Sequence, residues 1–301
     1  MHLNKTVMVT GAAGFIGKSL IKRLIKEKID FIPVDNFSSG DEHPGFEIEK
    51  FDITSQEFID KFRYSFISDI FHFASPCSVI QYNIDPVICS YQTIESLFNI
   101  IKLCRYTHSK IYYPSSGTVY GNLNKKMKEL DPTVPVNLYG QNKLACEHLL
   151  FLSRRFNLDS MIFRIFAGYG PEENHKGNIS SAITLFLNDI KNNKRPVVWG
   201  NGEQTRDFVY IDNIVEVFYQ ALNSNLIGTF NIGSGKGTSF NKIIEILNKE
   251  LKKDLEPKYI PKPSLYLENT LADISKMKGS FNVNPYNIEE GISIYLKDLE
   301  N

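Results

Sequence analysis

A tyrosine and a lysine four residues apart are the first side chains whose spacing suggests chemistry. Tyr139 and Lys143 belong to the segment YGQNK, where a helix would place both on one face. A lysine ammonium beside a phenol lowers the pKa of the phenol, so that the phenolate can take a proton from a hydroxyl group. Tyr106 and Lys110 repeat the spacing near an expected helix end, so spacing alone does not identify a site.

Hydroxyl side chains gather in the stretch YPSSGTVYG, residues 113–121, at the end of a strand-like run. Tyr139 follows in the next expected helix. In an α/β arrangement, the end of that strand and the start of that helix can face the same cleft. The stretch alone is explained either by a polar turn or by one side of an active site.

Three glycines in GAAGFIG, residues 11–17, form a candidate phosphate-binding loop between a strand-like run and an amphipathic helix. Gly11 allows a tight turn, Gly14 lets the backbone approach a pyrophosphate, and Gly17 lets the helix pack close to the strand. The helix N-terminus would present N–H groups and a positive dipole end to the phosphates. The alternative is a glycine turn that binds no ligand.

An acidic residue at the end of the second strand-like run indicates which cofactor binds. Asp35 follows Gly17 by 18 residues and would accept hydrogen bonds from the adenosine ribose. Its carboxylate would repel a 2′-phosphate, so the sequence favours NAD over NADP. Asp52 and Ile53 end the next run and are candidates for an adenine contact, although a solvated loop aspartate also explains Asp52.

The elements that must position these residues follow a regular alternation over the first 170 residues. The strand-like runs are 5–10, 30–35, 69–74, 110–115 and 160–166. The helix-like segments are 15–28, 85–104 and 137–156. Such alternation implies right-handed crossovers and a parallel sheet covered on both faces. The predicted fold class is α/β, with a Rossmann-type doubly wound parallel sheet.

The alternation breaks after about residue 170, where a polar, turn-rich segment begins. We predict an NAD-binding domain at 1–170, to which 206–238 returns. Residues 171–205 and 239–301 would form a smaller C-terminal substrate-binding lobe, with a cleft between the two parts.

Composition narrows the class of protein. The 301 residues include 34 Lys plus Arg and 34 Asp plus Glu, so the net charge gives no support for a nucleic-acid or polybasic membrane partner. Four scattered cysteines form neither a disulfide framework nor a zinc site, and we predict no metal. No apolar run reaches the roughly 20 residues that span a bilayer, and no signal peptide is apparent. We expect a cytoplasmic location.

Seven motifs in order give the chain a family resemblance. GAAGFIG, Asp35, PSSGTVYG, YGQNK, RIFAGYGP, RDFVYIDN and NIGSGKGTSF together resemble the extended short-chain dehydrogenase/reductases that modify nucleotide sugars, such as UDP-galactose 4-epimerases. The resemblance covers nearly the whole chain. It implies tightly bound NAD, a nucleoside-diphosphate sugar as substrate, and a homodimer formed by the helices at 85–104 and 137–156.

The resemblance also implies residue roles. Ser116 would hydrogen-bond the reacting sugar oxygen, Tyr139 would act as acid and base, and Lys143 would hold the nicotinamide ribose, with Ser115 structural. The predicted cofactor-binding residues are Gly11, Gly14, Phe15, Ile16, Gly17, Asp35, Asn36, Asp52, Ile53, Phe73, Ala74, Ser75, Tyr139 and Lys143. The predicted substrate-binding residues are Ser116, Thr118, Asn178, Trp199 and Arg206.

Three of these positions have plain structural alternatives. His72 lies beside the cofactor channel of relatives, but it is equally a core histidine at a strand end. Arg206 matches an arginine that grips the substrate diphosphate, and a surface ion pair with Asp207 is its alternative. Trp199 lies where relatives place an aromatic ring against the nucleobase, and a core tryptophan explains it as well.

Two departures from the family pattern concern the substrate. An asparagine that often touches substrate is replaced by Ala167. The second arginine that relatives use for the diphosphate has no clear counterpart, and the segment PKPSLYLENT offers Lys262 and Tyr266 instead. Either the phosphate clamp is rebuilt or the subsite differs.

The residues after Ser116 separate the reactions of the family. A 4,6-dehydratase needs an Asp-Glu pair there, and a UDP-glucuronate decarboxylase commonly has Glu at the second position. Here the positions hold Gly117 and Thr118, which cannot transfer a proton at neutral pH. We therefore predict an NAD-dependent 4-epimerase that acts through a transient 4-keto-sugar, on a UDP-hexose. The alternatives are a 4-oxidase or 4-reductase, a decarboxylase or dehydratase of the same family, and a non-catalytic NAD-sensing protein.

Overall fold

The computed structural model describes residues 5–41, 43–123, 125–263 and 266–300. It divides into two compact units. The first unit comprises residues up to Ser116 together with Asn137–Arg164 and Phe218–Phe230. The second unit comprises Gly117–Val136, Ile165–Val217 and the chain from Asn231 onward. By these contacts, residues 117–136, 165–170, 206–217 and 231–238 group with the second unit, and the functional division at 1–170 with 206–238 stays a prediction.

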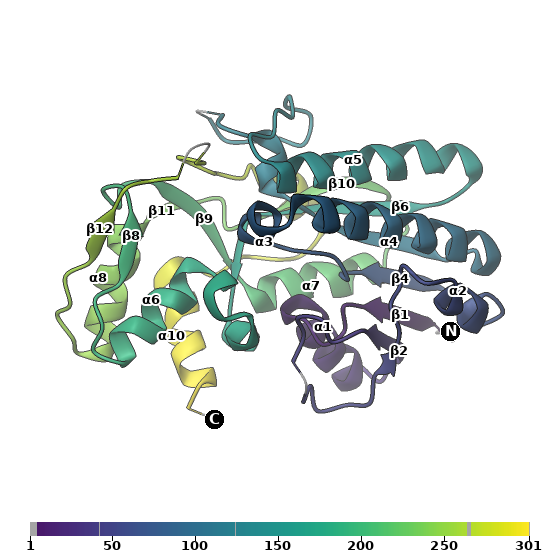
Figure 1. The fold of residues 1–301 in the computed structure, drawn as a ribbon, viewed down its shortest axis with the longest axis horizontal. Helices are drawn as coiled ribbons and strands as arrows, with labels where there is room; N and C mark the ends of the chain where they lie inside the picture. Colours follow the sequence, from purple (N-terminus) through teal and green to yellow (C-terminus); the bar gives the residue numbers. More distant parts are fainter. Residues whose placement is uncertain (1–4, 42, 124, 264–265, 301) are drawn as a thin grey trace. The chain divides into compact units, whose positions relative to one another are not determined.

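A seven-stranded sheet organises the first unit (Figure 1), in the order β10-β6-β5-β4-β1-β2-β3. The strands are β1 (Thr6–Thr10), β2 (Asp30–Asp35), β3 (Glu49–Lys50), β4 (Asp69–His72), β5 (Lys110–Ser116), β6 (Ser160–Ile165) and β10 (Gly228–Ile232). The pairs β1–β2, β1–β4, β2–β3 and β4–β5 are parallel. The order reverses between β1 and β4, which is the switch point where open α/β sheets bind ligands. The predicted doubly wound Rossmann-type fold is confirmed, and the strand of GTFNIGSG joins the main sheet as expected.

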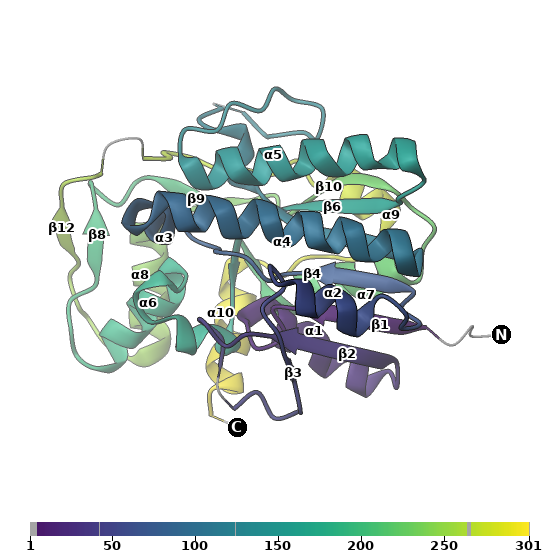
Figure 2. The ribbon, with the colours of Figure 1, turned by 45° about the vertical axis from the view of Figure 1, so that its right-hand side comes forward.

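Helices cover both faces of this sheet. They are α1 (Phe15–Lys26), α2 (Gln56–Phe62), α3 (Val79–Ile84), α4 (Pro86–Thr107), α5 (Leu138–Ser153) and α7 (Ile211–Leu222), with a short 3-10 helix η2 (Arg154–Phe156) after α5. Helices α4 and α5 run side by side, as Figure 2 shows. One core joins residues of α2, α4 and α5 to the sheet. On α7, Phe218 packs against Phe71 and Phe163, and the Tyr219 ring receives the Arg23 guanidinium of α1.

Polar residues at the starts of the helices fix where several of them begin. Asp85 accepts a hydrogen bond from the backbone of Ile88, with Pro86 at the first position of α4. Asn137 caps α5 through the Gly140 N–H at 2.9 Å. This second cap sets the start of the helix that carries Tyr139 and Lys143.

The second unit contains two small sheets, ordered β11-β9-β7 and β12-β8. Its strands are β7 (Ala167–Tyr169), β8 (Val197–Trp199), β9 (Thr205–Tyr210), β11 (Gly237–Ser239) and β12 (Lys258–Ile260). Its helices are η1 (Gly117–Tyr120), η3 (Pro171–Ile179), α6 (Ala182–Lys191), α8 (Phe240–Leu251), α9 (Ser275–Ser280) and α10 (Ile288–Asp298). The separate strand β9 was not anticipated, because TRDFVY runs directly into the helical segment of α7. Among the described residues, no helix combines the length and the apolar character that crossing a bilayer requires.

Candidate functional site

The glycine loop after β1 is shaped by two of its three glycines. Gly11 has a φ of +70°, and a Cβ there would lie 2.7 Å from the backbone of Ala74. A Cβ on Gly17 would lie 2.1 Å from the carbonyl oxygen of Gly11. A Cβ on Gly14 would meet only the Gly11 oxygen, at 3.2 Å. The fold therefore requires glycine at 11 and 17, whereas at Gly14 a Cβ would make one tight contact, within the loop itself.

The N-terminus of α1 is suited to an anion. Its N-cap is Gly14, which supplies no side-chain hydrogen bond, and the first turn holds no acidic residue. The leading N–H groups of a helix lack intrahelical partners, and the dipole favours negative charge at this end. A pyrophosphate fits this arrangement, and Phe15 and Ile16 lie in the same first turn.

Asp35 ends β2 beside the glycine loop and is 8% exposed. Its Oδ2 accepts a hydrogen bond from the Ala13 N–H at 3.0 Å, and its Oδ1 accepts one from the Phe37 N–H at 2.7 Å. Each carboxylate oxygen can accept a further hydrogen bond. The neighbouring Asn36 is engaged locally with the Ser38 N–H. Asp35 is thus held in a fixed orientation that a ribose diol can use.

The two candidate adenine contacts lie just beyond β3 and differ in exposure. Asp52 is exposed, and its Oδ1 accepts hydrogen bonds from the N–H and the hydroxyl of Thr54. Ile53 is buried in the core, and its carbonyl oxygen accepts from the Asn99 amide at 2.8 Å. Asp52 is occupied by its own turn, and its role toward adenine stays a prediction.

His72 at the end of β4 is a buried, hydrogen-bonded core residue. Its Nδ1 lies 2.9 Å from the Thr10 hydroxyl, and its Nε2 lies 3.3 Å from that of Ser96. Burial, reinforced by the positive charge of Lys143, lowers the pKa of His72 to about 3. The imidazole is therefore neutral near pH 7, which favours the core alternative. Of the cofactor candidates that follow it, the Phe73 ring packs against Phe218.

The end of β5 and the start of α5 bring together the three predicted catalytic side chains. Ser116 and Tyr139 share a hydrogen bond. The Lys143 ammonium donates to the Ser75 hydroxyl at 3.2 Å and to the carbonyl oxygen of Pro114 at 3.0 Å. Ser116 is 9% exposed and Lys143 is 3% exposed. The sequence had offered Tyr106–Lys110 as a second pair, but the Lys110 ammonium instead donates to the Leu226 carbonyl oxygen.

Burial sets the ionisation of this cluster. It raises the pKa of Tyr139, and the hydrogen bond with Ser116 partly offsets that effect. It lowers the pKa of Lys143, against the attraction of nearby groups that include Glu147. The Lys143 ammonium lies 5.9 Å from the centre of the Tyr139 ring. A phenol, a hydroxyl group and an ammonium arranged in this way can exchange a proton with a bound hydroxyl group.

Two contacts of this cluster were not anticipated from the sequence. Tyr82 of α3 packs edge-on against Tyr139, with ring centres 5.7 Å apart, and its hydroxyl contacts Thr93. Glu147 lies one turn beyond Lys143 and binds Ser115 and Arg164. No sequence signal points to Tyr82. The continued spacing of four residues from Lys143 to Glu147 was a signal that we did not use.

Arg206 of β9, in the second unit, is held by backbone carbonyl groups. Its guanidinium donates to the carbonyl oxygens of Thr205 at 2.9 Å, Glu268 at 3.0 Å and Leu267 at 2.6 Å. The rings of Tyr266 and Phe240 lie 5.1 and 5.6 Å from it. Burial lowers the pKa of Arg206.

Asp207, the alternative partner of Arg206, is engaged elsewhere. Successive side chains of a strand point to opposite faces. The Asp207 carboxylate accepts hydrogen bonds from the N–H groups of Ser234, Gly235 and Ala272. The ion pair that we considered from the sequence is therefore not how Arg206 is held.

Trp199 and the segment around Tyr266 lie close to this arginine. Trp199 is 38% exposed and meets the Tyr266 ring edge-on at 5.8 Å, so it is not a core tryptophan. Lys262, which we considered as a replacement for the missing arginine, pairs with Glu268. Arg206, Trp199, Tyr266, Lys262 and Glu268 thus form one polar and aromatic cluster of the second unit.

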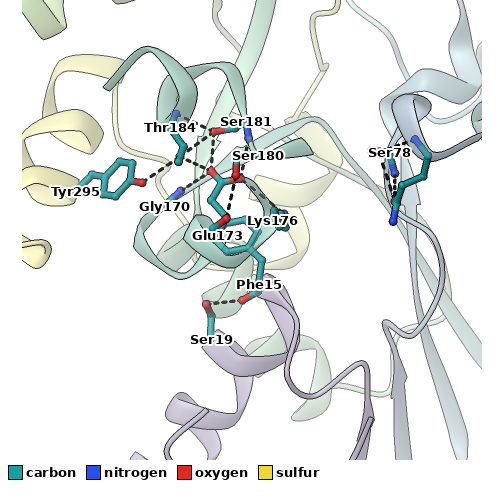
Figure 3. Close-up of polar contacts among 11 residues, drawn as sticks. Phe15, Ser19, Ser78, Gly170, Glu173, Lys176, Ser180, Ser181, Thr184 and Tyr295 are labelled. Carbon is teal, nitrogen blue, oxygen red and sulfur yellow. Dashed lines mark hydrogen bonds and ion pairs between the residues drawn. The ribbon is translucent and has the colours of Figure 1, made fainter. Parts of the chain in front are cut away.

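The remaining substrate candidates lie in 3-10 segments of the second unit. Thr118 is half-buried in η1, and Asn178 is exposed in η3. Figure 3 shows the buried Glu173 of η3 surrounded by donors of the segment that starts α6. Its carboxylate accepts from Ser181 N–H at 2.8 Å and from the Thr184 hydroxyl at 2.7 Å. Glu173 thereby anchors the segment that carries Asn178.

Comparison with known proteins shows to which family the chain is similar. The model of the NAD dependent epimerase/dehydratase family matches residues 7–233. A putative UDP-glucose 4-epimerase of Methanocaldococcus jannaschii is 32% identical over 253 residues, which cover 81% of this chain and 82% of the relative. An ADP-L-glycero-D-manno-heptose-6-epimerase of Brachyspira hyodysenteriae is 31% identical, with 98% of each chain covered. The crystal structure of a UDP-glucose 4-epimerase from Thermotoga maritima with UDP-glucose has a TM-score of 0.93, at 26% identity and 98% coverage of both chains.

The family match includes the glycine loop, Asp35 and the Ser116–Tyr139–Lys143 cluster. The glycine loop, the start of α1 without a side-chain cap or an acidic residue, and the oriented Asp35 carboxylate fit NAD, which is the cofactor of this family. The chain therefore belongs to the NAD-dependent epimerase/dehydratase family, within the extended short-chain dehydrogenases/reductases.

Proposed function

We propose that this protein is a nucleotide-sugar 4-epimerase that acts on a UDP-hexose. The observation that carries the proposal is the Ser116–Tyr139–Lys143 cluster, followed in the chain by Gly117 and Thr118 rather than by acidic residues. This set is sufficient for oxidation at C4 and for its reversal. It contains no further acid or base at the positions that elimination or decarboxylation would use.

Each member of the cluster has a defined task in this proposal. NAD, held by the glycine loop and Asp35, would supply the hydride acceptor and donor that oxidation at C4 and its reversal need. Tyr139 takes the proton of the 4-hydroxyl group and gives it back. Ser116 hydrogen-bonds the same oxygen atom. Lys143 stabilises the phenolate of Tyr139 by its charge and is available to the nicotinamide ribose. The predicted roles of the glycine loop and Asp35 in holding the cofactor belong to the same proposal.

The surroundings of Gly117 support a 4-epimerase over a dehydratase. A Cβ at this position would lie 3.0 Å from the Phe166 ring. This is tighter than ordinary van der Waals contact, so an aspartate there would require the ring to move. The Phe166 ring thus occupies the space that an acidic side chain at position 117 would need.

We further propose that the cluster around Arg206 binds the nucleoside diphosphate, with Trp199 beside the base. A guanidinium recognises phosphate oxygens through paired hydrogen bonds. Thr118 and Asn178 remain candidates for the sugar and nucleotide.

A homodimer is also proposed. Its support is the exposed apolar side chains of the two helices that the family resemblance assigns to the interface. Val87, Tyr91 and Phe98 of α4 are 74%, 57% and 47% exposed, and Phe151 of α5 is 60% exposed. Mass measurement in solution, before and after Val87→Asp, tests the dimer.

A cytoplasmic location agrees with the four cysteines, all of which are free thiols.

The function is tested by NMR of the products formed from a panel of nucleotide sugars without added cofactor. The panel holds UDP-glucose, UDP-N-acetylglucosamine, UDP-glucuronate, dTDP-glucose and an ADP-heptose. Formation of the C4 epimer of a UDP-hexose supports the proposal. A 4-keto product that appears only with added NAD indicates an oxidoreductase. Carbon dioxide release, loss of the 6-hydroxyl group or turnover of the ADP-heptose alone contradicts it.

A further inference from the structure

Consecutive residues at the end of β5 contact α5 at successive turns. The carbonyl oxygen of Pro114 accepts a hydrogen bond from Lys143, and the Ser115 hydroxyl donates to the Glu147 carboxylate. With the hydrogen bond described above, the contacts join Pro114 to Lys143, Ser115 to Glu147 and Ser116 to Tyr139. The helix residues are spaced by four and share one face. We call these three contacts the strand–helix ladder.

Glu147 is the helix residue of the ladder that no proposed chemical step uses. Its side chain is 5% exposed, and it receives the equally buried Arg164 of β6. The Arg164 Nε donates to Oε1 at 3.0 Å, and its Nη2 donates to Oε2 at 2.7 Å. A fork of this kind fixes both side chains. The pair therefore ties α5 to both β5 and β6.

Glu147 also acts on the charge of Lys143. The titratable groups that face Lys143 are Tyr139, Cys146 and Glu147 of α5, Tyr113 of β5, His72 of β4 and Cys77 after β4. Among them, Glu147 is a carboxylate, and Arg164 balances it. Replacing the Glu147 carboxylate by an amide would remove a negative charge that pairs with Arg164 and raises the pKa of Lys143.

We propose that Glu147, held by Arg164, is a positioning residue that sets α5 against β5 so that Tyr139 and Lys143 meet Ser116. The inference rests on the proposed function, because it assumes that Tyr139 and Lys143 perform the reaction. A displacement at Glu147 would shift Lys143 and Tyr139, which lie one and two turns away on the same helix face. Positioning errors of about 1 Å lower reaction rates by large factors.

The test compares Glu147→Gln, Glu147→Asp and Ser115→Ala. We expect Glu147→Gln to lower kcat at least tenfold with KM within about twofold, as expected for loss of alignment. The alkaline limb of its pH–rate profile should move to lower pH, because Lys143 then loses its proton more easily. Glu147→Asp keeps the charge and should retain the wild-type alkaline limb despite a lower kcat. Ser115→Ala should have a smaller effect of the same kind.

A matched control separates alignment from general stability. Ile59→Ala removes buried apolar contact on α2, outside the ladder. It should lower Tm with an unchanged alkaline limb and kcat. If Glu147→Gln behaves like Ile59→Ala, Glu147 only stabilises the fold and the inference is overturned.

The titration of Lys143, followed by NMR of protein with 15N-labelled lysine and assigned with Lys143→Arg, does not depend on activity. If wild-type protein converts no nucleotide sugar, the proposed function fails, while a lower Lys143 titration in Glu147→Gln still supports the coupling. If the wild type is active and Tyr139→Phe is not, yet Glu147→Gln shows wild-type kcat and titration, the inference alone fails.

Discussion

The two groups of predicted site residues are held in place by different kinds of partner. In the first unit, Tyr139, Lys143 and their neighbours contact one another and a strand end through the strand–helix ladder. In the second unit, Arg206 donates to three backbone carbonyl oxygens, and Trp199 is 38% exposed. In the first arrangement, the site residues bind one another and the end of one strand. The second arrangement keeps its aromatic edge accessible and is built on atoms that every residue type supplies.

This difference agrees with where the sequence departs from the expected family pattern. A cluster whose partners are mostly particular side chains tolerates few substitutions, because a change to one of them leaves a buried polar group unpaired. A cluster anchored on carbonyl oxygens keeps its anchor when the side chains around it change. Ala167 lies in the second unit, and so do Lys262 and Tyr266, which the sequence offers where the second arginine has no clear counterpart. Substrate selection can therefore change while the chemistry is kept.

The largest effect is expected from Tyr139→Phe, which removes the acid and base and keeps the ring. We expect kcat to fall by about a thousandfold, within the range for loss of a general base, while NAD stays bound. Turnover and the absorbance of bound cofactor measure the two outcomes. Tyr106→Phe is the control, since Tyr106 has the same spacing to a lysine but is 49% exposed. Near-normal turnover of Tyr139→Phe would show that Tyr139 of the first unit is not the acid and base.

The glycine loop allows a sharper contrast within the first unit. Gly17→Ala places a Cβ 2.1 Å from the Gly11 oxygen and should lower the free energy of unfolding by about 3 kcal/mol. Gly14→Ala should change it by less than about 1 kcal/mol and should instead weaken NAD binding. Urea denaturation and calorimetric titration with NAD distinguish them. Equal destabilisation by both changes would mean that glycine at position 14 serves the fold only.

A smaller effect is expected from Arg206→Ala in the second unit. Loss of a charged hydrogen-bonding partner should raise KM for the nucleotide sugar by about ten- to a hundredfold with little change in kcat. Arg195→Ala is a matched control, because the exposed Arg195 also donates to two carbonyl oxygens, those of Glu256 and Pro257. If both variants raise KM equally, Arg206 does no more than anchor the chain.

The smallest expected effect concerns the exclusion of water from His72 of the first unit. The pKa of His72 is lowered from 6.5 to about 3 in the folded state, so below pH 6.5 the unfolded chain binds more protons. Stability should therefore fall as pH decreases from 6.5 toward 3. Between pH 6.5 and 5, wild type should lose on the order of 1 to 2 kcal/mol more than His72→Gln. Urea denaturation of both proteins at the two pH values measures the difference, and parallel losses would show that water reaches His72.

Much of the first unit could be predicted from the sequence, because its signals are local. The glycines at 11, 14 and 17, the strand end at Asp35 and the spacing of Tyr139 and Lys143 each express one turn, one strand or one helix face. The parallel sheet with helices on both faces followed from the alternation of strands and helices, whereas the strand order was not predicted. Such signals depend on residues close in sequence, which a single chain displays directly.

The unanticipated contacts have partners far apart in sequence. Ser115 and Glu147 are separated by 32 residues, and Glu147 and Arg164 by 17. The carbonyl partners of Arg206 at 267 and 268 carry no side-chain signature at all. Glu173 sits in a segment that looks solvated, yet it is 1% exposed because hydroxyl groups of the next helix surround it. Tertiary placement alone determines these contacts.

The position of β10 has a consequence for how the protein is made. This strand is Gly228–Ile232, yet its neighbour in the sheet is β6, which ends at Ile165. During synthesis, the edge of β6 that pairs with β10 stays unpaired until most of the chain has been translated. Unpaired edges recruit other strands, and pairing of distant segments is slow. Nascent or truncated chains that stop before Gly228 would therefore be the aggregation-prone species, and expression should depend on how quickly the ribosome passes this strand.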